Sequence, residues 1–99
     1  GKAFDQSAPI APLVPAAVAG PVEQAPIWLK VNGQLRQSAR VADMSWSVAE
    51  IIANLSTYFR LEPGDLIFTG TPEGVGPVVA GDVIEAGVDG LGSLSVRIV

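Results

Sequence analysis

The sequence contains no histidine and no cysteine, and these absences remove the commonest catalytic groups. Without histidine, the chain lacks the side chain that most often acts as a general base. Without cysteine, it has neither a thiolate nucleophile nor a disulfide, which fits a cytoplasmic protein. No serine lies in a G-x-S-x-G turn, and the ten carboxylates include no E-x-E or D-x-D pair of the kind that holds a hard cation. The chain as it stands therefore does not contain a complete hydrolytic site.

Basic residues are also few and dispersed: six Lys and Arg face ten acidic residues, for a net charge of −4. This balance argues against nucleic-acid binding, which needs a basic patch. No apolar run approaches the roughly 20 residues of a membrane span. Four prolines between residues 8 and 21 interrupt the one segment that resembles a signal sequence. We therefore expect neither nucleic acid nor a membrane as a partner.

Apolar residues, by contrast, are abundant for a chain of this length. Ninety-nine residues make one small domain at most, yet 48% of them are hydrophobic and the mean hydropathy is +0.41. This excess indicates that some apolar surface is meant for a partner, either a second subunit or another part of the same protein.

Two turn dipeptides predict β-hairpins. The Asn-Gly pair at 32–33 lies between the alternating runs of residues 27–37 and is typical of a two-residue type I′ turn, because both of its positions need φ > 0. The Asp-Gly pair at 89–90 predicts a second hairpin, which joins a strand over 83–88 to an alternating strand over 92–99. Short antiparallel connections of this kind favour a mainly β domain.

Helical signals are fewer. Ser47 and Glu50 fit a capping box, and apolar residues at helical spacing predict a helix over 48–59 with one face buried against a sheet. A short helical turn is expected near 15–18, and the apolar run 66–68 is typical of a buried strand. The expected fold class is α+β, mainly β with one helix: a mixed β-sandwich or roll with the helix covering one opening.

The loop at 69–77 is the candidate functional element. It contains three glycines and two prolines in nine residues. Gly70 lets backbone N–H groups approach a ligand, because glycine has no Cβ. The hydroxyls of Thr69 and Thr71 flank it. With Lys2, these groups could bind an oxyanion or a carboxylate. The alternative interpretation is an ordinary glycine-rich turn between strands.

A Gly-Asp pair also occurs twice, at 64–65 and at 81–82, and each pair precedes an apolar run. Nothing else around the two segments matches. We interpret them as repeated turn chemistry and not as an internal sequence repeat.

Several longer motifs, in order along the chain, resemble the fumarylacetoacetate hydrolase family. Residues 1–9 resemble its G-K-x-F segment, and residues 30–37 resemble its K-V-N-G-E-x-R-Q hairpin. The D-M pair at 43–44 resembles its helix entry. Residues 61–77 resemble its L-x-P-G-D-[LIV]-I-x-T-G-T-P-x-G-V-G-P motif, and residues 80–82 match the family's last strand. The resemblance covers essentially all 99 residues.

Within that family, the chain is most similar to acylpyruvases such as fumarylpyruvate hydrolases of aromatic catabolism. The resemblance implies a divalent-metal-dependent hydrolase that cleaves a C–C bond of a small oxo acid with Mg²⁺ or Mn²⁺. It implies that Lys2 lies beside the metal as a catalytic residue, that Thr71 contacts a substrate carboxylate, and that Gly70 and Thr69 belong to the substrate-binding loop. It also implies a homodimer.

One departure from the family is large. The family's metal-binding carboxylates precede the G-K-x-F segment, and this sequence begins at that segment. We therefore expect residues 1–99 to be the C-terminal portion of a catalytic domain whose N-terminal, metal-binding portion is absent here. Gln6 also stands where several relatives have threonine.

Three hypotheses follow. In the first, the parent protein is an acylpyruvase-type hydrolase. In the second, it is an oxaloacetate decarboxylase or a 2-hydroxyhepta-2,4-diene-1,7-dioate isomerase of the same family. In the third, the isolated chain is an inactive fragment that binds no metal and serves in folding or oligomerisation.

Overall fold

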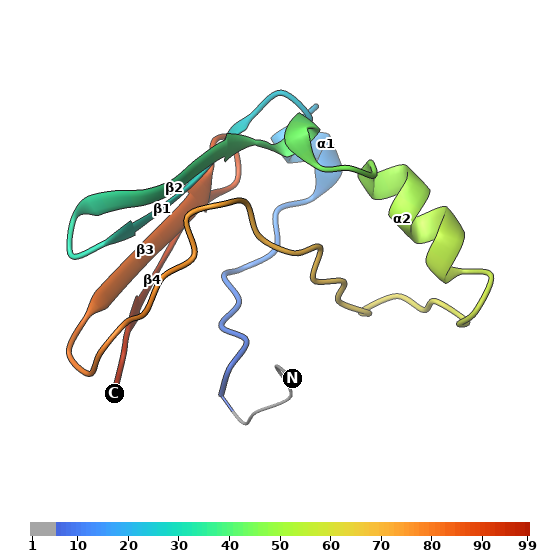
Figure 1. The fold of residues 1–99 in the computed structure, drawn as a ribbon. Helices are drawn as coiled ribbons and strands as arrows, with labels where there is room; N and C mark the ends of the chain where they lie inside the picture. Colours follow the sequence, from blue (N-terminus) through green and yellow to red (C-terminus); the bar gives the residue numbers. More distant parts are fainter. Residues whose placement is uncertain (1–5) are drawn as a thin grey trace.

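The computed structural model describes residues 6–99, which form one antiparallel sheet and two short α-helices (Figure 1). Lys2 lies outside the described residues. The elements in chain order are α1 (Ala16–Ala19), β1 (Pro26–Val31), β2 (Gln34–Arg40), the 3₁₀ helix η1 (Val41–Asp43), α2 (Val48–Leu55), β3 (Val83–Val88) and β4 (Gly92–Arg97). The strand order is β2-β1-β3-β4, so β1 and β3 join two hairpins into one sheet. None of the described helices is long and apolar enough to cross a membrane.

The first hairpin forms as the sequence predicts. Asn32 and Gly33 have φ of 50° and 81°, the two positive values that a type I′ turn requires. The register shifts between Leu29 and Lys30: Leu29 pairs with Gln37 but Lys30 pairs with Leu35. This β-bulge leaves one additional residue, Arg36, in β2.

The second hairpin is also confirmed, and the Asn32 side chain connects it to the first. The Asn32 amide donates to Asp82 Oδ1 at 2.9 Å, and its carbonyl oxygen accepts from the Val83 N–H at 2.9 Å. Gly90, in the loop between β3 and β4, has φ of 89°. The Asn32 turn therefore joins the first hairpin to the start of β3, at the end of the sheet opposite Gly90.

The two faces of the sheet differ in polarity. Because side chains alternate along a strand, Leu29 and Val31 share a face with Ile84 and Ala86, their partners on β3. The opposite face carries Trp28, which packs so closely on Gly87 that a Cβ there would lie 2.7 Å from the indole ring. Lys30 is exposed on that face, with its Nζ 5.3 Å from the Trp28 ring centroid.

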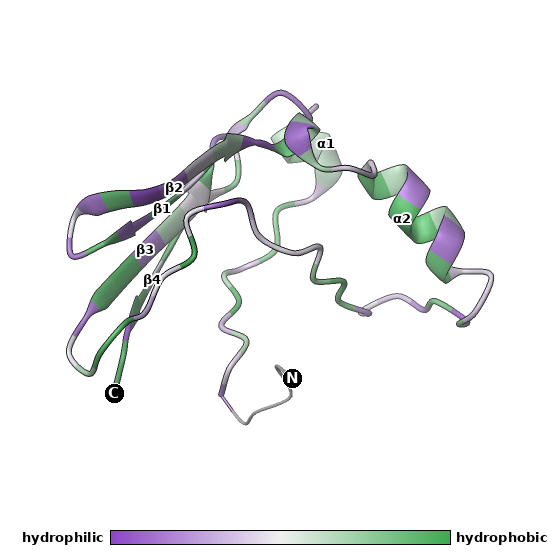
Figure 2. Cartoon of the chain, in the orientation of Figure 1, coloured by the Kyte–Doolittle hydropathy of each residue, from purple (hydrophilic) through white to green (hydrophobic). Residues whose placement is uncertain are grey.

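The buried core of the described chain is very small. Val31, 3% exposed, is the buried apolar residue, and Gln37, 8% exposed, is the buried polar one. Large apolar side chains lie on the surface instead, among them Trp46, Tyr58 and Phe59. Figure 2 shows apolar residues both along the sheet and on the turns of α2.

Helix α2 begins as expected but does not cover the sheet. The Ser47 hydroxyl accepts from the Glu50 N–H at 3.1 Å, and the Glu50 carboxylate accepts from the Ser47 N–H at 3.0 Å, which confirms the capping box. The hydrogen bond that the Ser47 N–H donates to the carboxylate lowers the pKa of Glu50, and the Ser47 side chain lowers it further. No α2 residue is buried, and α2 lies apart from the sheet (Figure 1). The expectation that the helix packs on a sheet or closes one opening of a sandwich is therefore wrong for the described residues. Neither face of the single sheet lies against α2.

The predicted end of this helix was also wrong: α2 ends at Leu55, not at residue 59. The Ser56 hydroxyl donates to the Ala53 carbonyl at 2.8 Å, and the Thr57 hydroxyl donates to the Asn54 carbonyl at 2.7 Å. Such side-chain bonds compete with the helical backbone pattern. The chain continues as a turn.

Residues 66–68 do not form the predicted buried strand; Leu66 and Phe68 are 52% and 68% exposed. A strand needs a neighbour for its backbone groups, and no described segment pairs with this run. An apolar run indicates that a segment is buried against other residues, but it does not identify those residues. The described residues therefore leave this segment extended and uncovered.

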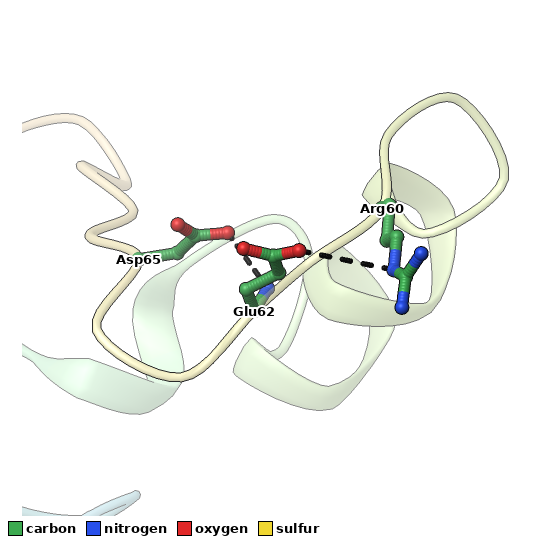
Figure 3. A network of polar contacts seen from close by, with 3 residues as sticks. All are labelled: Arg60, Glu62 and Asp65. Carbon is green, nitrogen blue, oxygen red and sulfur yellow. Dashed lines mark hydrogen bonds and ion pairs between the residues drawn. The ribbon is translucent and has the colours of Figure 1, made fainter.

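The two Gly-Asp turns have the same hydrogen bonds, which confirms repeated turn chemistry. The Asp65 carboxylate accepts from the Glu62 N–H at 2.8 Å, and Arg60 lies 3.8 Å from the Glu62 carboxylate at the surface (Figure 3). Likewise, the Asp82 carboxylate accepts from the Val79 N–H at 3.0 Å. In both turns the preceding glycine has positive φ, 95° and 93°. Each aspartate thus closes its own turn.

Candidate functional site

The glycine-rich loop is attached to the sheet by one side chain, that of Gln37. The Gln37 Nε2 lies 2.7 Å from Thr71 Oγ1 and 2.6 Å from the Pro72 carbonyl oxygen, with the Glu73 carbonyl oxygen at 3.4 Å. Gln37 is buried in β2, whereas Thr71 is exposed. A buried side chain of β2 is therefore hydrogen-bonded to an exposed hydroxyl of the loop.

Gln37 faces the loop because of its place in the sheet. It pairs with Leu29, so its side chain lies on the apolar face that also holds Val31. The β-bulge at Arg36 sets this alternation, since Arg36 adds one residue to β2. Without that residue, the direction of Gln37 relative to the turn would be reversed.

Glycines bring the loop against the bulge. Gly74 has φ of 103°, and a Cβ there would overlap the Arg36 carbonyl oxygen and lie 3.2 Å from Gln37 Cγ. Gly76 is less restricted: its Cβ would lie 3.5 Å from Arg36 Nη1, an ordinary contact. Gly70 has φ of 95° with open space around the Cβ position, so its constraint is conformational alone.

A small cavity of about 290 Å³ lies between the loop and the apolar face. Leu29, Val31 and Ile84 line it from the sheet, and Arg36 and Thr71 are among its polar lining residues. Its size suits a small molecule of a few carbon atoms. The Arg36 guanidinium also contributes to lowering the pKa of Asp82, after the larger effects of the hydrogen bonds from Val79 and Asn32. A small ligand here would meet an apolar wall, a cation and a hydroxyl.

The structure therefore joins part of the predicted site and leaves part of it untested. Thr69, Gly70 and Thr71 are consecutive on the loop, and Thr71 lines the cavity. Gln37 and Arg36 were not predicted as site residues from the sequence. Both lie in the predicted hairpin strand, but strict alternation does not show which of them points inward, because the β-bulge shifts the register.

The described residues do not themselves supply a metal centre: no group of three or more His, Cys, Asp or Glu within 6–99 could hold an ion. A centre for a hard cation needs several oxygen ligands around the ion, and the loop at 69–77 does not provide such a set. The loop carries one carboxylate, Glu73, which does not line the cavity. The polar groups that do line it include the Thr71 hydroxyl and the Arg36 guanidinium of β2, and these suit an anion.

Comparison with known proteins identifies the family. A model of the fumarylacetoacetate (FAA) hydrolase C-terminal region matches residues 1–99. The chain belongs to this family and represents its C-terminal region.

Two relatives within the family are similar to this chain in sequence. The chain is 58% identical over 77 residues to a fumarylpyruvate hydrolase of Ralstonia sp., covering 78% of this chain and 40% of that protein. It is 43% identical over 97 residues to the mitochondrial oxaloacetate tautomerase FAHD1 of Mus musculus, covering 98% of this chain and 44% of that protein.

One solved structure is similar to this chain over nearly its whole length. The fumarylpyruvate hydrolase of Pseudomonas aeruginosa in complex with Mn²⁺ and pyruvate has a TM-score of 0.95 and 54% identity, covering 98% of this chain and 42% of that one. The chain thus spans less than half the length of these relatives.

Proposed function

We propose that the protein containing this chain is a hydrolase that cleaves a C–C bond of acylpyruvates, with fumarylpyruvate as the reference substrate. The supporting observation is the higher identity to fumarylpyruvate hydrolases, 58% and 54%, than to the oxaloacetate tautomerase, 43%. In the proposed reaction, water adds across the bond between the acyl carbon and the pyruvate methylene. Fumarylpyruvate and water would give fumarate and pyruvate.

The role proposed for this chain is to bind the oxo acid. The Thr71 hydroxyl donates to a carboxylate or enolate oxygen, and Gly70 leaves room for the backbone to approach it. Thr69 borders the same loop, and Lys2 adds positive charge where the enolate develops. The cavity of about 290 Å³ with Arg36 and Thr71 in its lining supports this role, since both residues favour an anion.

The metal proposed for the whole protein is Mg²⁺ or Mn²⁺, and the Mn²⁺ in the Pseudomonas relative supports it. Because the described residues bring no suitable carboxylates together, we place its ligands outside them. The chain by itself would then bind no divalent ion and would be inactive. We assign no step of the reaction to residues 6–99 beyond binding and orienting the substrate.

Exposed apolar residues support a further part of the proposal. Leu66, Phe68, Tyr58 and Phe59 are between 52% and 75% exposed. Surface of this kind is normally covered. We assign it to the remaining portion of the same catalytic domain and to a homodimer interface.

A reaction of oxaloacetate is the second candidate, because the tautomerase relative covers 98% of this chain at 43% identity. Decarboxylation of oxaloacetate and isomerisation of a hydroxydienedioate belong to the same group of alternatives. All share an oxo acid whose enolate must be held.

The test is a substrate comparison with the full-length protein and Mn²⁺. Turnover is measured as the formation of product. We expect kcat/KM to be higher for fumarylpyruvate than for oxaloacetate. Thr71→Val should reduce kcat/KM by about 10- to 100-fold, the effect of one hydrogen bond to a charged group. The matched control is Thr57→Val, an exposed threonine after α2, which should leave turnover unchanged. Faster turnover of oxaloacetate would favour the second candidate. If neither substrate were consumed, both candidate functions would be excluded.

A further inference from the structure

The Gln37 side chain has one orientation that its surroundings permit. Its nitrogen lies near three oxygens, of which the Pro72 and Glu73 carbonyls can only accept hydrogen bonds. If the amide were turned around, its own oxygen would face these carbonyls without a donor between them. The nitrogen must therefore face the loop, and it acts there as a donor.

This orientation determines what the Thr71 hydroxyl does. An amide NH₂ group donates and does not accept, so Thr71 Oγ1, at 2.7 Å, is the acceptor. The hydroxyl has a single hydrogen, which must point elsewhere. Since Thr71 is exposed and lines the cavity, that hydrogen is available to a ligand.

We propose that Gln37 is a positioning residue that fixes the Thr71 hydroxyl as a hydrogen-bond donor toward the ligand. The site would thereby select an anionic oxygen, which accepts only, over an ammonium group, which donates only. This inference rests on the proposed function, in which the ligand is an oxo acid. It adds the residue that sets the polarity of the contact.

The burial of Gln37 supports a specific role. It is 8% exposed beside Val31, the most buried apolar side chain described. Placing an amide there costs free energy unless its hydrogen bonds are made, and an apolar residue would avoid that cost. The bonds that justify its position all run to the substrate-binding loop.

The first test measures pyruvate binding to the full-length protein with Mn²⁺ by calorimetry. We expect Gln37→Met and Thr71→Val each to weaken binding by about tenfold. The double variant should bind no more weakly than either single variant, because both disable the same contact: Thr71→Val removes the hydroxyl, and Gln37→Met removes the group that orients it. Gln34→Met is the matched control: the same change at an exposed position of β2 should leave affinity unchanged.

The second test distinguishes the direction of the hydrogen bond between residue 37 and Thr71 from a purely structural role of Gln37 in holding the loop. Gln37→Glu keeps the length of the side chain, but a carboxylate accepts from the Thr71 hydroxyl and removes its hydrogen from the ligand. Pyruvate affinity should fall at neutral pH and recover as the introduced carboxyl becomes protonated, since a protonated carboxyl again donates. The wild type should show no such recovery. This variant also keeps the test available if Gln37→Met does not fold.

The outcomes are distinct. Additive losses in the double variant, or pH-independent binding by Gln37→Glu, would overturn the inference even if fumarylpyruvate is hydrolysed. Coupled losses without fumarylpyruvate turnover would support the inference and reject the proposed reaction. A wild type that binds no pyruvate would overturn both.

Discussion

Three loop glycines allow strain and steric overlap to be measured separately. Replacing each by alanine adds the same methyl group at Gly70, Gly74 and Gly76. Gly70 has φ of 95° with open space, Gly74 has φ of 103° with the Arg36 backbone in the way, and Gly76 has neither a positive φ nor a close neighbour. The series therefore contains strain alone, strain with overlap, and a control.

The expected costs follow from these environments. Gly70→Ala should lower the free energy of unfolding by about 1–2 kcal/mol, the cost of positive φ for a residue with a Cβ. Gly74→Ala adds an overlap with a backbone carbonyl that cannot rotate away, worth a further ~1–3 kcal/mol, for a total of roughly 2–5 kcal/mol. Gly76→Ala should have no effect or add about 0.5 kcal/mol of stability.

The assay is urea unfolding of the full-length variants, with pyruvate affinity measured in parallel. Gly74→Ala should also weaken pyruvate binding, because relief of the overlap moves the loop away from Gln37. Equal destabilisation by Gly74→Ala and Gly76→Ala would refute the reasoning. So would full stability of Gly74→Ala, since the loop would then not rest against β2.

The remaining predictions concern the rest of the fold. Ser47→Ala should lower the free energy of unfolding by about 1 kcal/mol because α2 loses its N-cap, whereas Ser45→Ala, an exposed neighbour, should change it little; urea unfolding measures both. The pKa of Asp82 is lowered from its ordinary 3.8 by its bonds to Val79 and Asn32, so its contribution to stability is present above that value and is lost as the pH falls through the folded-state pKa. Unfolding measured between about pH 5 and pH 2 should therefore show a smaller loss of stability for Asp82→Asn than for the wild type. Gly87→Ala should cost about 1–3 kcal/mol and change the near-ultraviolet circular dichroism of Trp28, because the new Cβ would lie 2.7 Å from the indole ring; an unchanged spectrum would mean that the ring does not pack there.

Local chemistry made much of this fold predictable. The hairpin turns and the capping box each depend on residues close in sequence, such as Asn32 with Gly33 or Ser47 with Glu50. The same holds for the paired Gly-Asp turns. In each case, a side chain or a positive φ serves backbone groups a few positions away, so no distant contact has to be known.

The errors concern contacts between distant segments. The run 66–68 has the composition of a strand, but a strand depends on a neighbour that composition does not identify. Helix α2 has an apolar stripe whose partner could not be inferred. Gln37 was missed for the same reason: its side chain hydrogen-bonds to Thr71, which lies 34 positions away. The bulge at Arg36 shifts the register of β2, and Gln37 then lies on the face that meets the loop.

The measurement that tests the central claim most directly is a crystal structure of the full-length protein with Mn²⁺ and pyruvate. Our account predicts pyruvate at the loop, with a carboxylate or enolate oxygen about 2.5–3.0 Å from Thr71 Oγ1. It also predicts that Gln37 Nε2 still donates to the same hydroxyl. Pyruvate bound away from residues 69–77, or a Thr71 hydroxyl that contacts no ligand oxygen, would contradict it.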